Sequence, residues 1–216
     1  MKRILLVSGL LVGAVLAFFT FSCGRVKTSV TPQDYRGDWT SAALESTGNG
    51  DYVWRAFMIS DTTWEERYTL FLDSAKTMPV YTLRTDGTYL LTGPSNTVKG
   101  ADNITLRLSG KFLTLRIDDE VVIARYNLGD CGLKPGVELD ISEYGCVWMR
   151  PLSLFNAVYT IVKRDGNTLY FGAENDSLFI ETNRPNSLGP SLTKVTGMTA
   201  DTGGTPTSVD SPGVTK

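Results

Sequence analysis

Hydrophobic and polar residues alternate with a period of two along much of the chain, a pattern typical of half-buried β-strands. The alternation is clearest in residues 104–108, 113–117 and 137–141, where Ile, Leu or Val takes every second position. Polar links that contain glycine separate several such runs, and we interpret three of them as hairpin turns. These links are residues 85–87, 109–111 and 165–167, and residues 178–182 are predicted to form a last strand. Consecutive hairpins predict an antiparallel meander.

Residues 62–75 fit either a strand or a helix. A threonine at position 62 or 63, followed three residues later by glutamate, matches the capping box of a helix. Trp64, Tyr68 and Leu72 fall on one face of a helix, and they also fall on one face of a strand. The content of Thr, Phe, Tyr and Trp favours sheet, and Ser60-Asp61 precedes the segment as a turn. We therefore interpret this segment as a strand.

So many strands in one chain predict a sheet without free edges. The 216 residues suffice for one domain with its own core, which we place at residues 34–195. Open strand edges invite aggregation, so the sheet is expected to close on itself or to form two layers. The sequence predicts an all-β fold, an antiparallel up-and-down barrel or half-barrel of the lipocalin kind, with room for one or two short helices.

The N-terminus has the layout of a bacterial lipoprotein signal. Lys2 and Arg3 precede an uncharged apolar run over residues 4–21, and Cys23 follows a small residue. We interpret residues 1–22 as a signal peptide and Cys23 as the acylated anchor. A plain signal peptide and an uncleaved anchor helix are the alternatives, because the run is just long enough to span a bilayer.

Two polar segments flank the predicted domain. Residues 23–33 are short and lack periodicity, as a tether would, and residues 196–216 are rich in Thr, Gly, Pro and Ser, which predicts a disordered tail. The anchor places the protein in the cell envelope. Gly24 stands where an aspartate retains some lipoproteins at the inner membrane, so we expect the bacterial outer membrane.

The two other cysteines, Cys131 and Cys146, are expected to form a disulfide in an exported protein. Two unrelated buried thiols and a metal site are the alternatives. The chain contains no histidine, and two cysteines at this spacing match no zinc pattern. We therefore expect neither a metal nor a cofactor.

Charge and composition argue against nucleic-acid binding and against catalysis. Removal of Lys2 and Arg3 leaves 19 basic and 23 acidic residues, and no basic tract is present to follow a phosphate backbone. Without histidine there is no Ser-His-Asp or Cys-His site. Glu65 and Glu66 are adjacent, so on a strand they face opposite ways and form no carboxylate pair. We predict a non-enzymatic protein.

An ordered set of short features resembles the adenomatosis polyposis coli down-regulated (APCDD) domain. In chain order they are Trp39, Glu45, Arg55, Phe57, Trp64, Tyr68, Asp73, Pro79, Gly87, Val98, Gly100, Ala101, Cys131, Gly132, Gly145, Cys146, Leu169, Phe171 and Gly172. The chain departs from the family at Leu44 and residues 74–76, where a cysteine pair is expected, so one disulfide is missing. A lipocalin-like lipoprotein is the nearest alternative, because Gly37-Asp38-Trp39 is similar to the lipocalin Gly-x-Trp.

The resemblance implies a barrel that captures an acyl chain. Animal members of the family antagonise Wnt signalling, but a single lipidated copy with a bacterial signal gives no ground to expect a Wnt partner. The expected partners are a fatty acid or other apolar ligand and the membrane, reached through the N-terminal lipid. The residues proposed to bind the ligand are Phe57, Trp64, Tyr68 and Tyr89, with Arg55 at the headgroup. For the aromatic residues the alternative is ordinary core packing, and for Arg55 it is a salt bridge to Glu45, Glu65 or Glu66. A structural or adhesion lipoprotein with a filled barrel is the second function considered.

Overall fold

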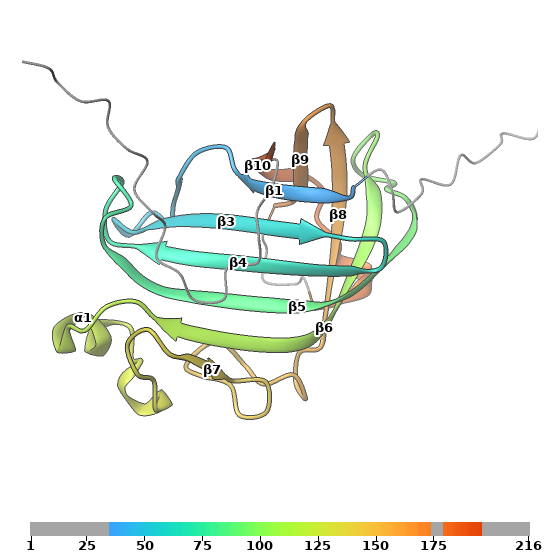
Figure 1. Cartoon of the computed structure of the whole chain (residues 1–216). Coiled ribbons are helices and arrows are strands. Elements are labelled where there is room, and N and C mark those ends of the chain that lie inside the picture. The colour runs from blue at the N-terminus through green and yellow to red at the C-terminus, as the bar shows by residue number, and fades with distance from the viewer. Residues whose placement is uncertain (1–34, 174–178, 196–216) are drawn as a thin grey trace, which may run out of the picture.

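The computed structural model describes residues 35–173 and 179–195, and in these ranges the chain forms a closed antiparallel β-barrel (Figure 1). The predicted signal peptide, Cys23, the tether and the tail lie outside the described residues. Among the described residues, no helix has the length and hydropathy needed to cross a membrane. The elements are β1 (Gly37–Ser41), β2 (Glu45–Ser46), β3 (Tyr52–Ile59), β4 (Thr63–Phe71), β5 (Pro79–Pro94), β6 (Asp102–Leu115), α1 (Glu120–Arg125), η2 (Gly129–Cys131), β7 (Glu138–Asp140), β8 (Ala157–Asp165), β9 (Thr168–Gly172), η3 (Glu181–Asn183) and β10 (Leu188–Val195).

Strand β1 closes the barrel because it pairs with β10 on one side and with β3 on the other. Trp39, for example, lies opposite Lys194 and Phe57. Around the ring the strand order is β1, β10, β9, β8, β6, β5, β4, β3, and then β1 again. The short strands β2 and β7 add to β3 and β6 outside the ring. The predicted all-β antiparallel barrel is thereby confirmed.

Two of the three predicted hairpin turns are wrong. Residues 85–87 lie inside β5 and residues 109–111 lie inside β6, and the pairing of the two strands shifts between Asp86 and Gly87. A side chain at Gly87 would come within 1.8 Å of the Arg107 carbonyl oxygen, so this glycine permits close backbone approach at a bulge. The third predicted turn, at residues 165–167, is confirmed. Strands β8 and β9 are antiparallel neighbours, and Asp165 of β8 pairs with Thr168 of β9 next to the turn.

The segment at residues 62–75 contains the predicted strand, which is β4 (Thr63–Phe71), while the predicted strand at 178–182 is wrong. Strand β4 pairs with β3 along its length and with β5 on its other side, which excludes the helix. Residue 178 lies outside the described residues, Phe179 and Ile180 lie in a turn, and η3 follows. Periodicity alone cannot assign so short an apolar run, and here Phe179 packs on the Phe155 ring. The last strand is β10.

The long strands serve two separate hydrophobic cores. The first core fills the barrel and contains Tyr35, Trp39, Phe57, Ile59, Trp64, Ile104, Leu106, Val162, Leu169, Phe171 and Leu192. The second lies between the other ends of β3–β6 and the segment that joins β6 to β8, and it contains Val53, Leu70, Val80, Tyr81, Leu113, Leu115, Leu128, Ile141, Cys146 and Met149. Figure 1 shows β7 of this segment below β6, and α1 beyond the arrowhead of β6.

The predicted Cys131–Cys146 disulfide is confirmed and ties this covering segment together, with the two Cα atoms 5.6 Å apart. Its sequence separation of 15 residues corresponds to about 3 kcal/mol of stability in the chain-entropy estimate. Helix α1 begins at Asp119, whose carboxylate accepts hydrogen bonds from the backbone N–H groups of Val121 and Val122. The disulfide and the cap hold the second core in place beneath the barrel.

Candidate ligand pocket

A pocket of about 520 Å³ lies beside the second core, to which its lining residue Met149 belongs and against which Leu83 packs. Its lining comprises Leu83, Lys111, Trp148, Met149, Arg150, Phe155, Phe179 and Ile180. Strands β5 and β6 supply Leu83 and Lys111, and the register puts both on one face of the sheet, because Leu83 opposes Leu113 and Thr85 opposes Lys111. The other wall comes from the disulfide-linked segment and the chain after β9. Ligand pockets in proteins commonly have this size.

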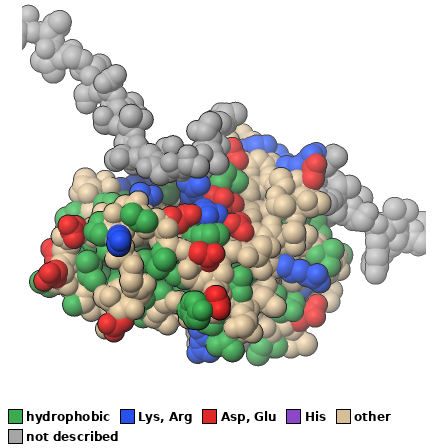
Figure 2. Space-filling model, turned by 60° about the horizontal axis from the view of Figure 1, so that its bottom comes forward, with side chains coloured by type: hydrophobic (Ala, Val, Ile, Leu, Met, Phe, Trp, Pro, Cys, Tyr) green, Lys and Arg blue, Asp and Glu red, His purple; other side chains and the backbone are tan. Residues whose placement is uncertain are grey.

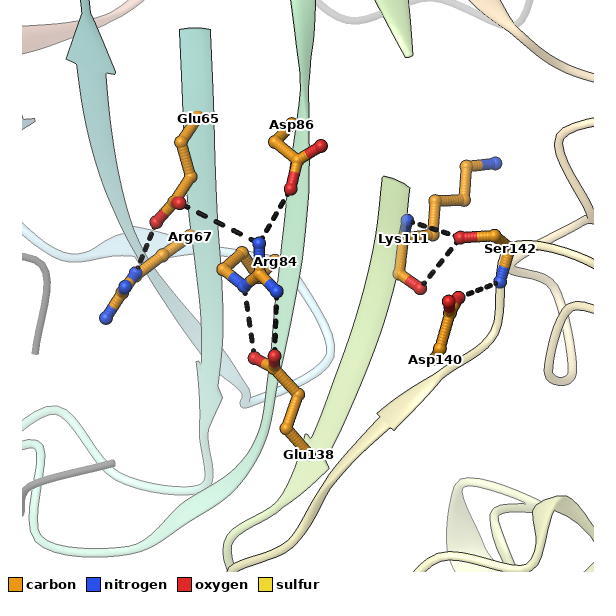
Figure 3. A network of polar contacts seen from close by, with 8 residues as sticks. All are labelled: Glu65, Arg67, Arg84, Asp86, Lys111, Glu138, Asp140 and Ser142. Atoms are coloured by element: carbon orange, nitrogen blue, oxygen red, sulfur yellow. Dashed lines mark hydrogen bonds and ion pairs between the residues drawn. The ribbon is translucent and has the colours of Figure 1, made fainter. Parts of the chain in front are cut away.

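Lys111 is the buried charge of the pocket. Its ammonium donates a hydrogen bond of 2.7 Å to the Arg150 carbonyl oxygen. Its backbone N–H donates to Ser142 Oγ at 2.9 Å, and Figure 3 shows the lysine side chain extending away from this contact and from the Arg84 cluster. Burial lowers the pKa of Lys111. No carboxylate among the described residues forms an ion pair with this ammonium, so the pocket holds a cation that an anionic group would stabilise.

Aromatic and aliphatic side chains form the remaining lining. The Phe155 and Phe179 rings are 4.2 Å apart, with an angle of 51° between their planes. The Arg150 guanidinium lies 5.0 Å from the centre of the Phe155 ring. Met149 is buried and belongs to the second core. The pocket thus combines apolar walls with two cations, which suits an amphiphile.

A network on the outer face of the sheet is fully paired and serves a structural role. Arg84 donates to both oxygens of Glu138 at 2.7 and 3.1 Å and to Asp86 at 2.7 Å, while Glu65 accepts from Arg67 (Figure 3). The hydrogen bonds from Arg84 lower the pKa of Glu138. Because Glu138 lies on β7 and Arg84 on β5, the network fastens β7 to the barrel.

The predicted ligand residues Phe57 and Trp64 lie in the barrel core, away from the pocket. The Phe57 ring stacks on Phe171 with 4.5 Å between centroids, and Trp64 Nε1 donates to the Thr88 carbonyl oxygen at 3.1 Å. Tyr89 packs at the edge of the same core and donates its hydroxyl to the Ser60 carbonyl oxygen at 3.0 Å. The three residues therefore hold the barrel together.

Arg55 and Tyr68 lie closer to the pocket. Arg55 opposes Tyr68, and Tyr68 opposes Leu83 of the pocket lining, so the three side chains point to the same face of the sheet. Arg55 is buried and donates to Glu45 at 2.9 Å. This contact is one of the salt bridges that the sequence offers as the alternative to a headgroup role for Arg55. Tyr68 stacks on Tyr81 at the edge of the second core. The structure brings these two predicted residues together beside the pocket.

Sequence reasoning missed the pocket residues Lys111, Met149, Arg150, Phe155 and Phe179. Lys111 follows Gly110 in a link whose sequence predicts a turn, whereas the others lie in segments without a regular period. One signal was available in the sequence. Lys111 is followed at every second position by a leucine, Leu113 and then Leu115, and this alternation places the lysine side chain on the buried face of the strand.

Known families and curated proteins give no match to this chain. The resemblance to the APCDD domain stays a prediction.

Among the described residues, no group of three or more Cys, Asp or Glu side chains is placed to hold a metal ion. The case for function consequently comes from the pocket.

Proposed function

We propose that this protein is a non-enzymatic lipoprotein of the bacterial cell envelope that binds an amphiphile, such as a fatty acid, in the Lys111 pocket. One observation carries the proposal: a buried ammonium without a carboxylate partner among the described residues lines an otherwise largely apolar pocket of about 520 Å³. An anionic headgroup at Lys111 offsets the cost of burying that charge, while the tail contacts the phenylalanine rings. Arg55 and Tyr68 are the predicted ligand residues nearest to this position.

A structural role is the second candidate, and the filled barrel favours it. Trp39, Phe57, Trp64 and Phe171 occupy the barrel interior and are buried. A lipocalin that holds its ligand inside the barrel needs space there, so the amphiphile is expected in the Lys111 pocket beside the second core. A protein that binds nothing in the Lys111 pocket supports the structural role.

Native mass spectrometry and displacement of a fluorescent fatty acid test ligand binding by the full chain. We expect co-purified fatty acid or phospholipid, and we expect Lys111→Met to weaken binding of the fluorescent acid roughly tenfold to a hundredfold, since a hydrogen bond to a charged group contributes about 1.5–3 kcal/mol. The matched control is Lys99→Met, because Lys99 is exposed on the β5–β6 connection. Equal affinity in both variants, or no binding by the wild type, contradicts the proposal.

A further inference from the structure

Exposed apolar side chains surround the mouth of the Lys111 pocket. Trp148, Phe179 and Ile180 line the pocket and are 58%, 46% and 53% exposed. Val147, beside Trp148, is 47% exposed and lines an adjoining cleft that shares Met149 and Arg150 with the pocket. We call these four residues the apolar rim. Exposed apolar patches of this kind mark binding surfaces.

The tip of the rim is a rigid hairpin. Cys146 and Met149 exchange two backbone hydrogen bonds of 2.9 Å across Val147 and Trp148, and Cys146 is also held by the disulfide. Val147 has φ of 55°, a left-handed conformation that disfavours β-branched residues and suits glycine or asparagine at a two-residue turn. The turn therefore retains an apolar side chain at its tip despite backbone strain.

Charge around the pocket favours an anionic surface. The charged residues of the pocket lining are Lys111 and Arg150, and no carboxylate of a described residue is among them. Arg150 is exposed beside the Phe155 ring. Tryptophan and phenylalanine next to arginine are the side chains that settle at the interface between lipid headgroups and acyl chains. Figure 2 shows hydrophobic patches with charged side chains between them on the face that Figure 1 has at its bottom.

We propose that the apolar rim docks on a phospholipid bilayer, with Trp148 at the acyl chains and Arg150 at the phosphates, so that the Lys111 pocket opens directly into lipid. The proposal rests on the proposed function, because a bilayer supplies the amphiphile that the pocket binds. A protein partner on the rim would seal the pocket mouth, whereas a bilayer leaves it open to its ligand. The lipid predicted on Cys23 would hold the chain at a membrane and so bring the apolar rim near a bilayer.

Tryptophan fluorescence of the full chain on phosphatidylcholine–phosphatidylglycerol vesicles with brominated acyl chains tests the docking. Of the four tryptophans, Trp39 and Trp64 are buried, and Lys76 covers the Trp54 ring at 3.0 Å. We expect the bromines to quench the share of the emission that comes from Trp148. The quenching should disappear in Trp148→Phe and weaken in Val147→Asn, which removes the apolar tip while asparagine tolerates the positive φ. The vesicles should also shield Trp148 from acrylamide.

Equal quenching in the wild type and in Trp148→Phe overturns the proposal, as does acrylamide access that vesicles leave unchanged. Shielding from acrylamide already without vesicles also overturns it, because a segment of the chain or a second copy then covers the rim. Binding of the fluorescent fatty acid is measured in the same samples. If the chain binds the acid but the bromines do not quench Trp148, only the docking is refuted. If the bromines quench Trp148 but the chain does not bind the acid, the proposed function is refuted, and with it the pocket's link to the bilayer.

Discussion

Burying an ammonium group costs free energy unless an opposite charge or several acceptors compensate it, and Lys111 has the Arg150 carbonyl oxygen as its acceptor at 2.7 Å. Such a lysine can be replaced by an apolar residue with little loss of stability. We therefore propose a role for Lys111 in ligand binding rather than in folding. Arg55, which is also buried, differs because Glu45 neutralises its charge.

Val147 is the second residue whose conformation conflicts with its type. Glycine adopts the φ of 55° at position 147 without strain, so it is the residue type that this turn favours. We therefore expect Val147→Gly to raise the free energy of unfolding by about 1 kcal/mol, because the substitution relieves the strain. Urea denaturation of the full chain measures the change. Val121→Gly is the control, since Val121 is exposed within α1 and glycine destabilises a helix. A loss of stability in Val147→Gly would show that the turn carries no strain.

At the scale of elements, β7 is held mainly through its contact with β6 and through the Arg84 network. The pKa of Glu138 is lowered by the hydrogen bonds from Arg84, so its stabilising effect is present above the unfolded pKa near 4.5 and is lost as the pH falls through the folded value. We expect Glu138→Gln to be less stable than the wild type at pH 7, and we expect the two to converge as the pH falls below about 4.5. Thermal unfolding as a function of pH measures this difference, and a constant difference down to low pH would contradict the role of the Arg84–Glu138 pair.

The sequence predicts the elements well where one periodic signal dominates. Strand β4 is recognisable because Trp64, Tyr68 and their neighbours alternate, and the disulfide follows from an even cysteine pair in a chain predicted to be exported. The links at 85–87 and 109–111 mislead because glycine marks both turns and bulges, and only the pairing of β5 with β6 distinguishes the two. Phe155 and Phe179 meet across irregular segments, and no local pattern encodes that contact.

At the scale of the whole molecule, the described residues form two hydrophobic cores that share one continuous sheet. The barrel core is filled by large aromatic residues, and the second core depends on the covering segment with α1, β7 and the disulfide. The Lys111 pocket lies beside the second core, and Met149 of that core forms part of its wall. The interior of the barrel is thus packed, and the binding site that we propose lies beside the second core.

The most direct test of this account compares palmitate with hexadecanol in the wild type and in Lys111→Met. The two ligands have the same chain length and differ in the charged head, so calorimetric titration of the full chain isolates the contribution of that charge. We predict that the wild type binds the acid about tenfold or more tightly than the alcohol, and that Lys111→Met removes this preference while it retains affinity for the alcohol. The same preference in both proteins, or none in the wild type, would contradict the assignment of Lys111 as the headgroup site.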